Sequence, residues 1–72
     1  MTKYQYLLAK KESGELSILL RIGLPVQILR QMDIYASHLA HPEASQLRLS
    51  LEQNASQATV HRAIAFMRQE LD

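Results

Sequence analysis

Apolar residues recur along most of the chain with the period of an α-helix. The most regular stripe lies in the segment 56–71 and consists of Val60, Ala63, Ile64, Met67 and Leu71. These positions follow the i, i+3, i+4, i+7 spacing that places side chains on one helical face. A second stripe, from Val26 to Leu39, predicts a helix from Pro25 to Ala40, because proline suits the first helical position.

The segment between Pro42 and Gln53 predicts a further short helix. Pro42 would start this helix, and Glu43 would lie in its first turn, where a negative charge is favourable. Its expected apolar face consists of Ala44, Leu47 and Leu51. Leu49 lies off that face.

The phase of the two stripes predicts a bend between these helices. Continued as one straight helix, the face of the segment 42–53 would reach Arg62 and miss Val60 and Ile64. A bend at Asn54-Ala55 restores the phase, and Ser56 is a good N-cap for the helix that follows. We therefore expect two helices in the segment 42–71.

The first 22 residues admit two interpretations. Tyr4, Leu7 and Leu8 stand at helical spacing after Thr2, which can act as an N-cap. However, "KYQY" alternates, and Ser13-Gly14 can close a hairpin onto "ELSILLRI". We expect helices, and therefore a mainly α fold, a compact bundle of about four to five short helices. The alternative is an N-terminal β-hairpin followed by three helices.

The length of 72 residues predicts a single small helical domain, residues 1–72. A chain of this size buries only about 60% of its unfolded surface, so disulfides, metals or self-association usually support it. Cysteine is absent, which excludes disulfides and thiolate catalysis. We therefore expect a homodimer, and we expect no cofactor.

The net charge of +1 gives no strong indication of a nucleic-acid partner. Residues 1–41 carry five Lys and Arg and three acidic residues, which gives +2. Residues 42–72 carry three Arg and four acidic residues, which gives −1. The charge of this second half counts against DNA binding by residues 42–72.

Residues 47–64, "LRLSLEQNASQATVHRAI", resemble the helix-turn-helix of bacterial repressors and resolvase-like proteins. The resemblance rests on the small Ser50 facing the second helix, the turn at Asn54-Ala55, the cap Ser56, the pair Thr59-Val60, and Arg62 before Ala63-Ile64. Such proteins usually have Gly at the turn, where this chain has Asn54, a residue that tolerates a left-handed backbone. Ser50 replaces the usual Ala.

This resemblance implies a DNA-binding surface on the second helix, within a bundle that contains a helix-turn-helix. The first helix of such a motif crosses the DNA backbone, and the second presents polar side chains to base edges. The side chains expected to point outward are Ser56, Gln57, His61 and Arg62. Glutamine pairs with adenine and arginine with guanine. The residues expected at phosphates are Thr59, Arg48 and Arg68.

A second stretch, residues 15–32, also resembles a helix-turn-helix, and its "GLPVQILR" is similar to the turn and second helix of MerR-type regulators. The positions that would lock its helices together are Ile18, Ile22, Leu24, Leu29 and Met32. Its base contacts would come from Gln27, Arg30 and Gln31, with Val26 exposed. The alternative is an ordinary corner in the core. One of the two motifs is expected to build the core or a dimer interface, and the third helix, 25–40, is the better candidate for that interface.

The pattern gives little support to catalysis or metal binding. His38 and His41 are three residues apart, but no third ligand follows at a convincing spacing. The chain has no Gly-rich phosphate loop and no acid–base pair, so we expect no enzyme. No apolar run approaches the roughly 20 residues of a membrane span, and the N-terminus does not resemble a signal peptide. We expect a cytoplasmic protein without a membrane partner.

Two functions fit these observations. The first is a small DNA-binding transcriptional regulator that acts as a dimer and inserts the helix starting at Ser56 into the major groove. The alternative is a small helical protein-interaction module, such as an adaptor, inhibitor or anti-activator, that binds a partner protein through an apolar surface. In the alternative, the polar residues 57–62 are only the solvated face of a capped helix.

Overall fold

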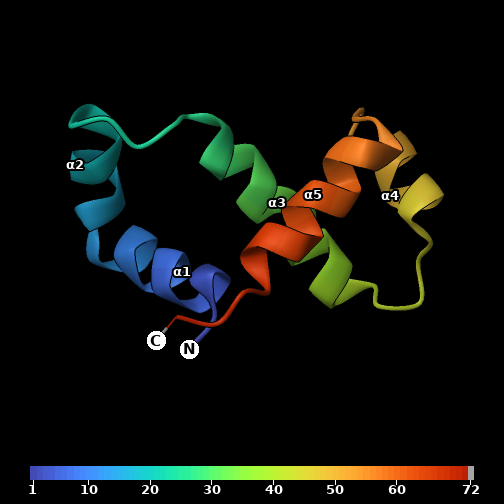
Figure 1. Ribbon diagram of the computed structural model, residues 1–72, viewed down its shortest axis with the longest axis horizontal. Helices are drawn as coiled ribbons and strands as arrows, with labels where there is room; N and C mark the ends of the chain where they lie inside the picture. Colours follow the sequence, from blue (N-terminus) through green and yellow to red (C-terminus); the bar gives the residue numbers. More distant parts are fainter. Residues whose placement is uncertain (72) are drawn as a thin grey trace.

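The chain folds into five helices, as a computed structural model describing residues 1–71 shows (Figure 1). The helices are α1 Lys3–Ser13, α2 Glu15–Arg21, α3 Gln27–Ala40, α4 Gln46–Glu52 and α5 Gln57–Met67. The expectation of a mainly α bundle is confirmed, and the alternative of an N-terminal hairpin is wrong because residues 3–13 and 15–21 form two helices. The only β pairing within residues 1–71 is an isolated antiparallel bridge between Thr2 and Glu70.

Helix α1 begins and ends at local signals. The Thr2 hydroxyl accepts the backbone N–H of Gln5, and the Gln5 side chain accepts the N–H of Thr2, which makes a capping box. Gly14 ends α1 in the left-handed region at φ 82°, where a residue with a Cβ is strained. The chain therefore reverses directly into α2, and the Lys10 ammonium contacts the Glu15 carboxylate across this junction. That hydrogen bond and the negative charge of Glu15 raise the pKa of Lys10.

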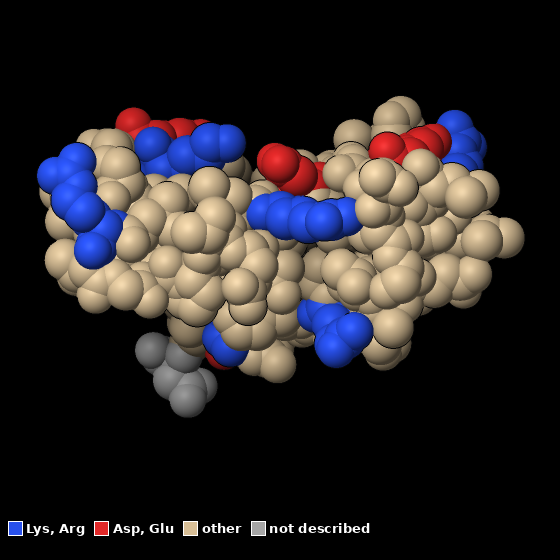
Figure 2. All heavy atoms as spheres, turned by 90° about the horizontal axis from the view of Figure 1, so that it is seen from above, with Lys and Arg blue, Asp and Glu red and all other residues tan. Residues whose placement is uncertain are grey.

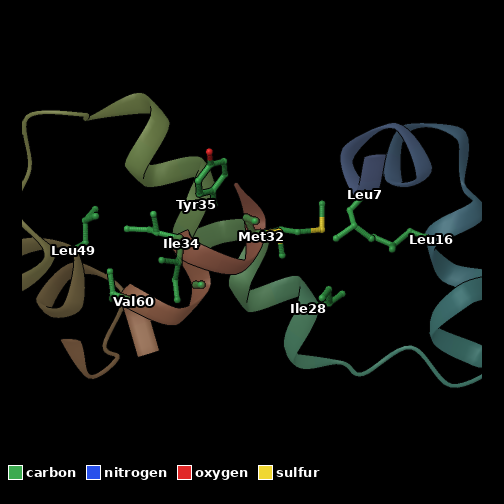
Figure 3. Close-up of a cluster of buried hydrophobic side chains, with 11 residues drawn as sticks. Leu7, Leu16, Ile28, Met32, Ile34, Tyr35, Leu49 and Val60 are labelled. Carbon is green, nitrogen blue, oxygen red and sulfur yellow. The ribbon is translucent and has the colours of Figure 1, made fainter. Parts of the chain in front are cut away.

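Helix α3 is the centre of the core. Its buried side chains face two directions: Ile34 lies beside Leu49 and Val60, whereas Met32 extends toward Leu7 at the other end (Figure 3). The middle of this apolar stripe therefore packs within the chain, against α1, α4 and α5, whereas Val26 and Leu39 at its two ends are 71% and 52% exposed. The helix begins later than predicted, because Val26 occupies the N-cap position and Pro25 precedes it.

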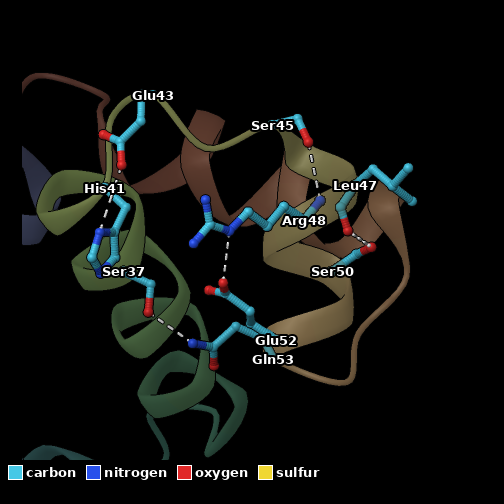
Figure 4. Close-up of polar contacts among 9 residues, drawn as sticks. All are labelled: Ser37, His41, Glu43, Ser45, Leu47, Arg48, Ser50, Glu52 and Gln53. Carbon is cyan, nitrogen blue, oxygen red and sulfur yellow. Dashed lines mark hydrogen bonds and ion pairs between the residues drawn. The ribbon is translucent and has the colours of Figure 1, made fainter.

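The predictions for α4 are wrong in two respects. The helix starts at Gln46, because the hydroxyl of Ser45 accepts the Arg48 N–H and caps it (Figure 4). Pro42 and Glu43 therefore lie in the preceding turn. The buried face contains Leu49 and Ser50, and the two leucines predicted to be buried are exposed, Leu47 by 53% and Leu51 by 75%.

The bend before α5 is confirmed, and α5 ends earlier than the apolar stripe predicted. Its residues Val60, Ala63, Ile64 and Met67 are buried. Beyond Met67 the chain leaves the helix and joins the N-terminus: Lys3 N–H donates to Gln69, and Leu71 N–H donates to the carbonyl of Met1. The two ends of the chain consequently lie side by side (Figure 1), and Leu71 remains 36% exposed.

Candidate nucleic-acid interface

The connection between α4 and α5 is a four-residue turn that closes on itself. Asn54 adopts φ 52°, the left-handed conformation that its residue type was predicted to tolerate. The Ala55 N–H donates to the carbonyl of Ser50 at 2.9 Å, and the Asn54 N–H donates to that of Leu51 at 3.4 Å. This pair of bonds is a Schellman arrangement, which fixes the direction in which the chain leaves a helix.

Two side chains, Arg30 of α3 and Gln53 of the turn itself, connect this turn to α3. An Nη of Arg30 donates to the carbonyl of Asn54 at 2.7 Å and to that of Gln53 at 3.3 Å. The Gln53 amide in turn donates to the Ser37 hydroxyl at 2.8 Å, a contact that is partly buried (Figure 4). These two carbonyls follow the last residue of α4, and the guanidinium of Arg30 gives both of them a hydrogen-bond donor. The angle between α4 and α5 is therefore held from both sides of the turn.

The turn gives a direct test of this geometry. Asn54→Gly should leave stability unchanged or raise it by up to about 1 kcal/mol, because glycine adopts positive φ without strain. Asn54→Val should cost about 1–3 kcal/mol, because a β-branched residue is strained there. Urea denaturation of the two variants measures the difference. Equal stability for both would contradict the left-handed conformation of residue 54.

Helix α5 presents a polar face to solvent. Gln57, His61 and Arg62 are exposed, and their opposite face carries the buried stripe. Ser56 is the predicted cap: its hydroxyl accepts the Thr59 N–H at 3.1 Å and also bonds the Thr59 hydroxyl at 2.9 Å. The side chains of Ser56 and Thr59 are thus engaged in holding the helix end, and Thr59 is half-buried.

The cationic residues around α5 are spread out. Arg48 donates from Nε to the Glu52 carboxylate at 2.9 Å, so part of its charge is offset (Figure 4). Arg68 is exposed at the end of α5, and Arg62 donates from Nε to the Ala58 carbonyl at 3.3 Å. Figure 2 shows separate Lys and Arg side chains on one face with large uncharged areas between them, and no continuous basic field.

Two residues on the exposed face of α5 were missing from the sequence prediction. At 100° per residue, Ala58 and Ala65 lie near the middle of that face, between Gln57 and His61 on one side and Arg62 on the other. Both alanines are exposed. The helical phase of the buried stripe was the signal that could have identified them.

The second candidate motif does not form a locked pair of helices. Ile18 and Ile22, predicted to lock it, are 56% and 76% exposed, and α2 packs on α1 without contacting α3. Leu24 and Leu29 do pack partly against the core, Met32 is buried, and Val26 is exposed as expected. Residues 15–32 therefore form a corner around the core, which was the alternative interpretation.

The polar residues of this second stretch nevertheless lie beside α5. An open hollow of 270 Å³ between α3 and α5 is lined by Gln27, Arg30, Gln31, Ile34, Thr59 and Arg62. The structure thus brings three side chains of one candidate motif together with two of the other. The two groups are at least 28 positions apart in the sequence, so the sequence alone did not predict that they would lie together.

None of the three histidines lines this hollow. His38 and His41 lie at the C-terminal end of α3, and His61 lies on α5. His38 packs against the Tyr35 ring, His41 lies 3.8 Å from a Glu43 carboxylate oxygen, and His61 Nδ1 lies 3.5 Å from the Gln46 amide nitrogen. No group of three potential metal ligands occurs within residues 1–71.

Comparisons with family models, curated proteins and solved structures found no match to this chain. Within residues 1–71, none of the helices has the length and apolar character needed to cross a membrane.

Proposed function

We propose that this chain is a small DNA-binding regulator that acts as a dimer and inserts α5 into the major groove. One observation carries the proposal: α4 and α5 are joined by a tightly closed turn, fixed to α3, and α5 exposes a polar face. A major groove about 12 Å wide accepts one α-helix, and the N-terminal residues of the recognition helix contact base edges.

The exposed residues of α5 have side chains suited to base recognition. Gln57, in the first turn, pairs through its amide with adenine. Arg62 keeps both Nη groups for guanine, since its Nε is bonded to the helix backbone. Ala58 and Ala65 fit a thymine methyl group, because they are small, apolar and central on the face. Arg48 and Arg68 are assigned to flanking phosphates.

The dimer contact is assigned to the α2 end of the molecule. Ile18 of α2, its C-cap Ile22, and Val26 are exposed there, by 56%, 76% and 71%. Among the helices of residues 1–71, α2 contacts only α1. The longest dimension of one molecule is 33 Å, and α5 lies away from the α2 end (Figure 1). Two copies joined at their α2 ends would hold one α5 helix on each side of the contact, as the two half-sites of a palindrome require.

Selection from a random duplex library, together with mass measurement in solution, tests the proposal. The wild type should be a dimer and should enrich a palindrome, with affinity that falls steeply as salt rises. Ile22→Glu should give a monomer that enriches only one half-site, because a charge at the contact opposes association. Absence of enrichment at low salt would reject DNA recognition, and a monomeric wild type would reject the dimer.

The exposed leucines of α4 favour a second function, binding to a partner protein. Leu47 and Leu51 project from the outer side of α4 at 53% and 75% exposure. A pair of leucines at i, i+4 is suited to an apolar groove on a partner protein. A protein-interaction module is therefore the second candidate, and it predicts that Leu51→Ser abolishes partner binding without altering the fold.

A further inference from the structure

We propose that the hollow between α3 and α5 binds a DNA backbone phosphate at the edge of the site that α5 contacts. The proposal rests on the proposed DNA-binding function and adds a positioning contact to it. It concerns Gln27, Arg30 and Gln31 of α3 together with Thr59 and Arg62 of α5.

The charge of this hollow favours an anion. Arg30 and Arg62 both line it, and no acidic residue is among its lining residues. None of the ion pairs within residues 1–71 involves either guanidinium. Asp33, one turn farther along α3, is exposed and lies outside the lining. A phosphate bound to Arg30 would also be attracted by the positive charge of Arg62, whose Nη groups stay available for guanine.

Arg30 is held in place before any ligand binds. One of its Nη groups is occupied by the carbonyls of Gln53 and Asn54, at 3.3 Å and 2.7 Å. The other Nη and the Nε–H remain as donors beside the hollow. Because the guanidinium is planar and its position is set by these bonds, little side-chain freedom is lost when a phosphate oxygen binds.

The neutral residues of the hollow supply further donors without additional charge. Gln27 is exposed at the start of α3, and Gln31 is half-buried one turn later. Each amide NH₂ can donate to a phosphate oxygen. The hollow adjoins the N-terminal half of α5, the part of a recognition helix that lies deepest in the groove. A phosphate held there would fix the rotation of α5 relative to the base pairs.

Charge changes at Gln31 test this site without altering the proposed base contacts. Gln31→Glu places a carboxylate beside the phosphate and should weaken binding to specific and non-specific duplexes equally, by about threefold to tenfold. Gln31→Lys adds one phosphate contact and should steepen the dependence of log K on log salt by about 0.9 per subunit. Matched controls are Lys11→Gln and Glu12→Gln, which change net charge by the same amounts on the exposed surface of α1.

A duplex in which single phosphates are replaced by neutral methylphosphonates locates the contact. Neutralising one phosphate per half-site should weaken the wild type and should have no further effect on Gln31→Glu. Inorganic phosphate, followed through the Nε–H signal of Arg30, should bind far more weakly than the duplex.

The outcomes separate the two proposals. If the wild type selects a palindrome but both Gln31 variants behave like their α1 controls, the phosphate site is rejected and the proposed function stands. If inorganic phosphate binds in the hollow but no duplex binds at low salt, the DNA backbone is rejected as the ligand. If the wild type binds neither, both proposals are rejected.

Discussion

Leu49→Ala is expected to destabilise the protein by about 2–5 kcal/mol, because the truncation leaves a cavity where a fully buried side chain contacted the core. A chain of this length has a total stability of only about 4–11 kcal/mol. The variant should therefore be partly unfolded at 37 °C. Urea denaturation followed by circular dichroism measures the loss.

Leu51→Ala is the matched control, since it removes the same atoms two residues away on the same helix. Leu51 is 75% exposed, so its truncation should change stability by no more than about 0.5 kcal/mol. The two variants also test the structure against the hydrophobic pattern, which predicted that Leu51 is buried and Leu49 is not. A large loss for Leu51→Ala with a small loss for Leu49→Ala would mean that α4 is rotated on the core.

The face of α4 shows why the hydrophobic pattern alone was insufficient. Leucines stand at positions 47, 49 and 51, and Leu49 lies about 160–200° around a helix from the other two. The pattern favoured the larger set, Leu47 and Leu51. The motif resemblance placed Ser50 toward α5, and Ser50 is indeed buried. Ser50 and Leu49 are neighbours on the helix surface, so the residue predicted from the motif resemblance identified the correct face.

Local signals were predictable, whereas contacts between distant segments were not. Thr2 and Ser56 cap their helices as expected, because an N-cap depends on residues within one turn. The bond from Arg30 to the carbonyl of Asn54 joins residues 24 positions apart, and nothing near Arg30 in sequence indicates it. The hollow between α3 and α5 was unpredictable for the same reason, because its lining residues come from segments far apart in the sequence. The outward side chains of α5 were predictable because the buried stripe fixes the phase of that helix.

Replacing Arg62 should have the largest effect on DNA recognition. A bidentate contact between Arg and guanine is worth about 1–3 kcal/mol, and a symmetric dimer makes it twice, which gives about 2–6 kcal/mol. Specific binding usually exceeds non-specific binding by about 4–10 kcal/mol. Arg62→Ala should therefore remove most of the preference for the selected palindrome. Affinity for that palindrome and for a scrambled duplex, at one salt concentration, measures the change.

Arg62→Lys separates base recognition from simple charge. Lysine keeps the positive charge beside the hollow but lacks the planar fork that fits two guanine acceptors. The variant should bind scrambled duplexes as the wild type does and should lose preference for the palindrome. The helix should persist, because the Arg62 side chain is exposed and, within residues 1–71, hydrogen-bonds only to the Ala58 carbonyl of the same helix. If Arg62→Lys retains full preference, Arg62 contributes through its charge, and specificity then has to come from Gln57, His61 and the exposed alanines of α5.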